Sequence, residues 1–293
     1  MVTRPLKSTS RSTTPAFTQG VVRPIQQGDW NLAYLFPSEI AEARQRNGLV
    51  LLPLAPVEWH GPHLTMGCDP LLAHAFARRL AAELRCPYYP PLYLGTERER
   101  TPDSLEALGF ERDQFIEGMD FPKNSVASAY IREEVFALVV RNMLEILLHR
   151  MHFRRVVIVN GHGADNQCET LSRLCREFNG ASTEGECARW IFAGFAHTEH
   201  GSIGHADAEE SSMLAAAWPG CVEVNRLPKE GPLKNIENAV VDGETFENHP
   251  TPDHSVRPEH DPRYQTDAAR GEEQMARAAR TELEGIRRWM AGG

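Results

Sequence analysis

The sequence predicts an α/β protein in which a mostly parallel sheet carries helices on both faces. Short apolar runs rich in β-branched residues alternate along the chain with longer segments of helical periodicity. At 293 residues and 41% hydrophobic content, the chain can bury a sizeable core as one large domain. Two of the apolar runs end in clusters of His, Asp and Glu, and the carboxyl ends of parallel strands are where such sheets place their ligand sites.

The first strand is expected at 48–54, where apolar residues run without the alternation of a half-exposed strand. The longest core helix is expected at 132–150, because Phe136, Val140 and Leu144 recur at helical spacing and give a broad face for packing on the sheet. Further strands are expected at 87–94, 154–160, 188–196 and 220–224, and further helices at 70–84, 166–178, 208–217 and 269–289.

The domain organisation follows from composition. Residues 1–20 are rich in Ser and Thr and lack the apolar segment of a secretory signal, so they are expected to form a mobile arm before a single domain at 21–293. The charged segment 96–120 is longer than an ordinary α/β loop and is expected to be an insertion that serves as a lid or a subunit contact. The segment 243–265 has too many prolines for regular structure and is expected to be a second, surface insertion.

Charge and cysteine usage narrow the possible partners. The formal charge is −9, from 31 basic and 40 acidic residues spread along the chain, so neither nucleic acid nor an anionic membrane surface is an expected partner. No apolar stretch approaches the roughly 20 residues that a membrane-spanning helix needs. The six cysteines contain no C-x-x-C pair, which indicates reduced thiols in a soluble, cytoplasmic protein.

The cluster with the clearest chemistry follows the first strand. Glu58, His60 and Asp69 lie within twelve residues of one another, and His162 stands in a Gly-flanked turn after the strand at 154–160. A mixed His, Asp and Glu set without thiolate suits Zn²⁺, Mn²⁺ or Fe²⁺. Two such ions can share a bridging carboxylate and a bridging water. The sequence therefore predicts a divalent-metal site at one edge of the sheet.

A third cluster follows the strand expected at 188–196. His205, Asp207 and Glu210 precede or begin the helix at 208–217, and a carboxylate in the first turn is favoured by the helix dipole and can also point into a site. His205 is a candidate to shuttle a proton to a leaving group. Asp207 or Ser202 can instead act only as a helix cap.

Three ordered motifs between residues 45 and 225 resemble the creatininase (creatinine amidohydrolase) family. They are the run Glu58-Trp59-His60-Gly61-Pro62-His63-Leu64 with Asp69, then Asn160-Gly161-His162-Gly163, then His205-Ala206 with Glu210-Ser211-Ser212. The family pattern is E-x-H-G-x-H-L-P with a following T-D pair, then N-G-H-G-G-N, then H-A-G with E-T-S. Three motifs in the right order are far more specific than any one alone.

The resemblance implies a creatininase-like hydrolase domain with two divalent ions per subunit, usually in homo-oligomers. It implies that Glu58, His60, Asp69 and His162 are metal ligands, with Asp69 as the bridge between the ions. Glu210 is implied as a ligand or as the partner of the site water, and His205 as the proton-transferring residue. The implied substrate is a small molecule with a cyclic or acyl C–N bond.

Three departures from the family pattern bear on the substrate. Ala164 stands where the creatinine-cleaving members carry Glu, so the missing ligand of the second ion is assigned to Glu210. Gly201 stands where those members place a Trp that closes over creatinine, and the F-P-G-T stretch appears only as Phe-Pro-Lys-Asn at 121–124. Creatinine is therefore not the expected substrate.

Alternatives remain open at this point. The first reading is an amidohydrolase in which His205 protonates the departing nitrogen. The second keeps the metal centre but cleaves a C–C bond in a cyclic polyol diketone of the oxidised-inositol type, with Arg98, Arg100 and His63 near the mouth of the site. A non-catalytic binding protein is the third. Asp165 and Asn166 are interpreted as caps of the helix at 166–178.

Overall fold

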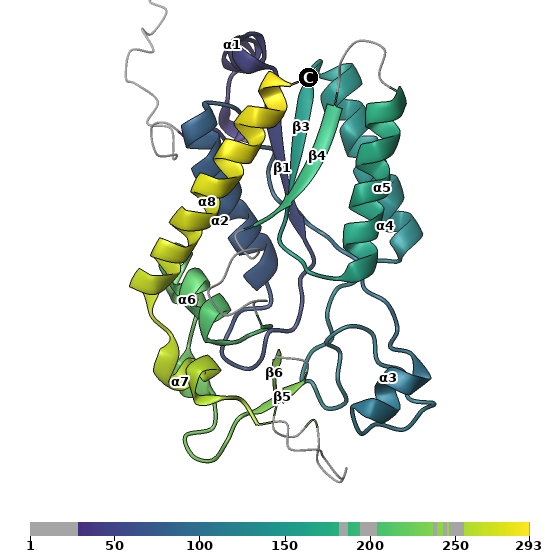
Figure 1. The fold of residues 1–293 in the computed structure, drawn as a ribbon, viewed down its shortest axis with the longest axis vertical. Helices are drawn as coiled ribbons and strands as arrows, with labels where there is room; N and C mark the ends of the chain where they lie inside the picture. Colours follow the sequence, from purple (N-terminus) through teal and green to yellow (C-terminus); the bar gives the residue numbers. More distant parts are fainter. Residues whose placement is uncertain are drawn as a thin grey trace, which may run out of the picture.

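The computed structural model describes residues 29–181, 187–193, 204–236, 239–242, 245 and 255–292. Its centre is a parallel four-stranded sheet with the strand order β2-β1-β3-β4 (Figure 1). The strands are β1 (Leu49–Ala55), β2 (Leu92–Tyr93), β3 (Arg155–Asn160) and β4 (Cys187–Phe192). The predicted fold class, a mostly parallel sheet with helices on both faces, is confirmed.

Burial on both faces of the sheet explains why the two central strands, β1 and β3, are apolar without alternation. Every residue of β1 is buried, and Leu51 and Leu52 pair with Val157 and Ile158 of β3. Successive side chains point to opposite faces of a sheet. Leu51 therefore joins the core on one face and Leu52 joins the core on the other.

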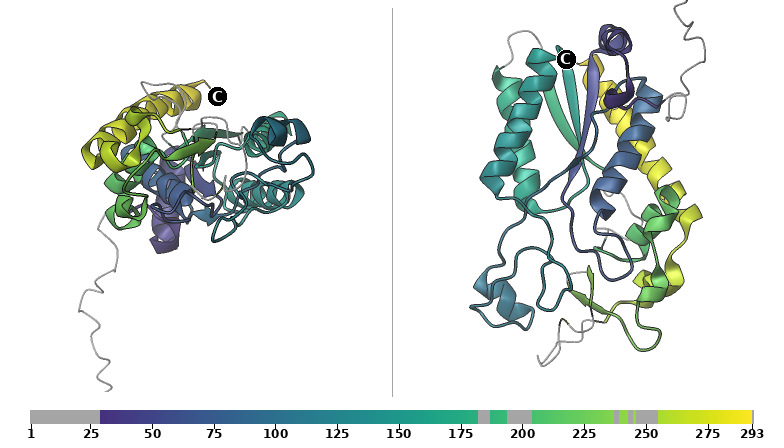
Figure 2. Two further views of the ribbon diagram at one scale, coloured as in Figure 1. Left: turned by 90° about the horizontal axis from the view of Figure 1, so that it is seen from below. Right: turned by 180° about the vertical axis from the view of Figure 1, so that it is seen from behind.

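Two pairs of helices cover the faces of the sheet. Helices α2 (Cys68–Leu84) and α8 (Ala268–Ala291) lie on one face, and α4 (Glu133–Glu145) and α5 (Asp165–Ala181) lie on the other (Figures 1 and 2). The helix expected at 132–150 is present as α4 followed by a π-helical turn, Ile146–Arg150. Among the described residues, no helix has the length and apolar character of a membrane span.

The remaining elements gather mostly beyond the carboxyl ends of the strands. Helix α6 (Ala208–Ala217) packs on α8, and α3 (Pro102–Ala107) lies in the 96–120 insertion, near the hairpin of β5 (Lys234–Ile236) and β6 (Ala239–Val241). Apolar residues of the insertion and the hairpin form one small core that includes Leu105, Ile116, Ile236 and Val241. The insertion is thereby anchored over the end of the sheet. The other helices are α1 (Pro37–Asn47) and α7 (Pro262–Gln265).

Two expected strands need correction. No strand forms at 220–224, where the chain makes 3-10 turns at Pro219–Cys221 and Val224–Arg226. Pro219 fixes its own φ and has no N–H, which overrides the β propensity of the residues that follow. The strand expected at 87–94 shrinks to β2 and two isolated bridges through Tyr88, to Asn31 and Leu51, because two prolines interrupt its hydrogen bonding. The arm at 1–20 and most of 243–254 lie outside the described residues.

Candidate metal centre

The loops after β1 and β3 converge because those strands are neighbours that end level with each other, with Leu54 paired to Asn160. The loop after β1 carries Glu58 and His60, and the first turn of α2 carries Asp69. A Cβ atom at Gly161 would lie 2.4 Å from the backbone oxygen of Asp69, so only glycine lets the β3 loop pass this close. The close approach sets His162 beside Asp69.

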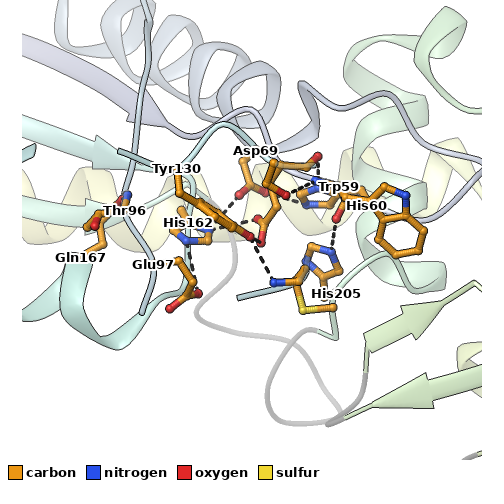
Figure 3. A network of polar contacts seen from close by, with 12 residues as sticks. Trp59, His60, Asp69, Thr96, Glu97, Tyr130, His162, Gln167 and His205 are labelled. Carbon is orange, nitrogen blue, oxygen red and sulfur yellow. Dashed lines mark hydrogen bonds and ion pairs between the residues drawn. The ribbon is translucent and has the colours of Figure 1, made fainter. Parts of the chain in front are cut away.

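Asp69 joins two groups of potential metal ligands, and it lies between His60 and His162 (Figure 3). In the first group, His162 Nδ1 is 3.1 Å from Asp69 Oδ2 and 3.2 Å from Glu58 Oε2. In the second, His60 Nε2 is 2.9 Å from Asp69 Oδ1 and 3.6 Å from Glu210 Oε1. Within each group the ligand atoms lie within 4.8 Å of one another. One carboxylate thus offers a different oxygen to each group.

Helix α6 fixes the position of Glu210. The side chain of Asp207 caps this helix by accepting hydrogen bonds from the backbone N–H groups of Glu209 and Glu210. The capping role considered for Asp207 is therefore confirmed. Glu210 Oε2 accepts a 2.6 Å hydrogen bond from the Ala206 N–H, which turns Oε1 towards His60.

The charges of the centre fit divalent cations. Glu58, Asp69 and Glu210 are at most 3% exposed, and buried carboxylates require compensating charge. Burial alone would lower the pKa of His60, but Asp69 and Glu210 outweigh it and raise that pKa well above its usual value. Burial would likewise lower the pKa of His162, but Glu58 and Asp69 outweigh it and raise that pKa well above its usual value. Without ions, the two histidines supply the positive charge that cations would otherwise bring.

Several contacts orient these side chains. His60 Nδ1 lies 3.1 Å from the Glu58 backbone oxygen and donates its proton there, which leaves Nε2 for the second group. The Tyr130 hydroxyl donates a 2.5 Å hydrogen bond to Glu58 Oε1. Burial and the Glu58 charge both raise the pKa of Tyr130, so it remains a phenol that donates.

His205 lies against the second group. Its Nε2 is 2.7 Å from the Trp59 carbonyl oxygen, and its ring centroid is 4.0 Å from that of His60 (Figure 3). Nε2 therefore carries the proton, and Nδ1 is the basic nitrogen. Burial and then the neighbouring His60 lower the pKa of His205, which keeps the ring neutral. His205 also forms a possible ligand group with Glu58 and His60.

A cavity of about 740 Å³ opens over the centre. Its lining includes five of the six predicted site residues: Glu58, Asp69, His162, His205 and Glu210. The 96–120 insertion supplies much of the lining, from Glu97 to Thr101, with Ser104, Gly118 and Met119. The insertion thus borders the site.

Some residues of this site carry no signal in the sequence. Glu97 Oε2 lies 3.7 Å from His162 Nε2, and Tyr130 follows a segment without periodicity. The capping role predicted for Asp165 and Asn166 is wrong, because Asp165 is the first helical residue of α5 and the Asn166 amide donates to Thr96 Oγ1. His197, His200, Gly201 and Ser202 lie outside the described residues.

Fold and site together define an α/β protein with two buried, carboxylate-linked donor groups for divalent cations beneath an open cavity. The sequence matches the family model described as "Creatininase: Creatinine amidohydrolase" over residues 33–284. The chain belongs to the creatininase family, which confirms the resemblance seen in the motifs. A comparison of the sequence with curated proteins found no match.

Solved structures share the fold. A structure described as "Creatininase Mn" has 20% identity and a TM-score of 0.63, with 89% of this chain and 99% of that chain covered. A mutant creatininase of the Zn–Zn type has 19% identity and a TM-score of 0.64, with 90% and 99% covered. A putative creatinine amidohydrolase from Bacteroides fragilis NCTC 9343 has 17% identity and a TM-score of 0.59, with 91% and 98% covered.

Proposed function

We propose that this protein is a metal-dependent amidohydrolase that cleaves a C–N bond in a small cyclic or acyl amide, including formamides. The observation that carries the proposal is the placement of Asp69 between two buried donor groups at the floor of the cavity. Glu58 and His162 would hold one ion and His60 and Glu210 the other, with Asp69 shared. The Mn and Zn–Zn creatininase structures support Mn²⁺ or Zn²⁺ as occupants, and Fe²⁺ suits the same donors.

The bound ions would supply Lewis acidity, which lowers the pKa of a water held between them towards neutrality and polarises the substrate carbonyl. The protein's own groups manage the proton. His205 is neutral and presents Nδ1 as a base, so it can accept a proton from the attacking water and pass it to the departing nitrogen. Its hydrogen bond to the Trp59 carbonyl holds the tautomer that this role needs.

The cavity wall carries hydrogen-bond acceptors and an arginine that is already paired. Asn166 Oδ1 is buried without a hydrogen-bond partner among the described residues, and Glu97 adds a second acceptor beside the centre. Such acceptors suit substrates that bring N–H or O–H donors. Arg98, which favoured the cyclic diketone alternative, is directed instead to Glu133 and Glu169. Its charge is therefore already matched by carboxylates.

The test has two stages, metal content and turnover. Elemental analysis should find about two ions per subunit in wild type and a sharp loss in Asp69→Ala. A panel of creatinine, simple lactams, N-formyl aminopyrimidines and cyclic polyol diketones should then show turnover of an amide and little of creatinine. Consumption of diketones alone would refute amide hydrolysis and favour the alternative. A metal-free protein that resists reconstitution would favour the binding-protein reading.

Two further expectations stay with this proposal. The homo-oligomer is implied by the family, and the cytoplasmic location by cysteine usage. All six cysteines are free thiols.

A further inference from the structure

The second donor group contains a thiol as well as nitrogen and oxygen. Cys68 is the first residue of α2 and directly precedes Asp69. Its sulfur belongs to a group with His60, Asp69 and Glu210 in which the ligand atoms all lie within 4.8 Å of one another. The residue is fully buried. The sequence predicted a site without thiolate, so this neighbour was not expected.

The geometry makes the two groups chemically unequal. The group around His162 consists of nitrogen and oxygen donors, and it faces the cavity through Glu58, Asp69 and His162. Without Cys68, the second group has three protein donors, the same number as the first group; Cys68 would be the fourth. Zinc in proteins is most often four-coordinate, with thiolate among its preferred ligands. Ala164, which lines the same cavity, has no donor atom to offer.

A packing role alone would leave the sulfur among apolar side chains. Cys68 does contact an apolar core with Leu64, Leu72 and Leu214. However, its sulfur is also within reach of three polar ligand atoms, so it lies at the boundary between that core and the donor group. A fully buried thiol beside two carboxylates gains a favourable partner only when a cation is bound between them.

We propose that Cys68 is a protein ligand of the ion held by His60, Asp69 and Glu210. This inference rests on the proposed function. Binding replaces the S–H bond by a sulfur–metal bond and releases one proton to solvent. The second position then favours a thiophilic ion such as Zn²⁺ or Co²⁺, whereas the first position accepts a harder ion such as Mn²⁺.

Cobalt provides a readout that does not depend on turnover. Metal-free protein is titrated with Co²⁺, and absorption is followed in the near ultraviolet, where thiolate-to-cobalt charge transfer appears. Wild type should bind about two ions per subunit and develop this band with one of them. Cys68→Ser should lose the band and bind that ion at least about tenfold more weakly. Cys86→Ala is the matched control, because Cys86 is also fully buried but packs in a different core.

A wild-type measurement covers the case in which Cys68→Ser fails to fold. Under mildly denaturing conditions, bound Co²⁺ should protect Cys68 from alkylation more strongly than it protects Cys86, as judged by peptide mass spectrometry. Two bound ions without a charge-transfer band, a band that survives in Cys68→Ser, or equal alkylation of both thiols would overturn the role of Cys68 and leave the hydrolase proposal standing. Wild type that binds no cobalt would overturn both.

Discussion

Gly271 lets helix α8 touch the backbone of helix α6, and its replacement by alanine should separate the two. A Cβ atom there would lie 2.0 Å from the Ser212 carbonyl oxygen and 2.6 Å from the Met213 nitrogen. Backbone atoms cannot turn aside as a side chain can, so the helices must move apart by roughly 1 Å to restore ordinary contact. Ser212 is two residues beyond Glu210 on α6, so the shift would reach the second donor group.

The cost can be worked from these contacts. Overpacking a core costs about 1–3 kcal/mol, and contact with backbone indicates the upper end. Alanine recovers about 1 kcal/mol of helix propensity relative to glycine. The net loss for Gly271→Ala is therefore about 2 kcal/mol. At roughly 2–4 °C per kcal/mol for a large domain, Tm should fall by about 4–8 °C.

Gly285→Ala is the control within the same helix. Its Cβ atom would meet the Arg189 guanidinium at 3.7 Å and Glu282 Oε2 at 3.9 Å, which are ordinary contacts. The substitution should therefore raise the stability by up to about 1 kcal/mol. Thermal unfolding followed by circular dichroism compares the two variants. In Gly271→Ala, elemental analysis should show that the ion of the second donor group is lost before the ion of the first. Equal Tm shifts in the two variants, or a Tm of Gly271→Ala equal to that of wild type, would refute the packing argument.

The remaining predictions concern the metal centre. Glu210→Gln should retain about one ion per subunit, and Glu58→Gln should retain the other; loss of both ions from either variant would contradict two separable sites. His205→Gln should keep both ions by elemental analysis while turnover falls by about 10²-fold or more, and a parallel loss of metal would make His205 a ligand instead. In the ion-free protein the pKa values of His60 and His162 are raised, so their stabilisation is complete below about pH 6.5 and is lost as pH rises through the folded-state values. Tm of the ion-free protein should thus fall from pH 6.5 to 9, while that of the loaded protein holds; equal pH profiles would refute the linkage.

The sequence could locate most of the site because its residues follow strands. Glu58 and His60 come after β1 and His162 after β3, and parallel neighbours end at the same edge. Glu210 could be placed because a first-turn position on a helix has a defined direction. Each of these residues lies only a few positions in the sequence from the strand or helix that places it, which made these inferences possible.

The residues that were missed depend on contacts far apart in the sequence. Tyr130 reaches Glu58 across 72 positions from a segment without regular structure, so no periodicity could indicate it. Glu97 belongs to an insertion whose path is set by its packing on the β5–β6 hairpin. Cys68 has no second cysteine close to it in the sequence, and only the arrangement of α2 and α6 brings its sulfur to Glu210. Local patterns carry no information on such pairings.

The centre also couples folding to metal binding. Three carboxylates lie buried at the junction of β1, α2 and α6, and without ions they depend on protonated His60 and His162 for compensation. Those same nitrogens must release their protons to bind a metal. Metal ions and protons are therefore alternative counter-charges for one buried cluster, so metal binding should release protons. Bound metal should stabilise the fold most above pH 6.5, where the charges of the ion-free cluster are least balanced.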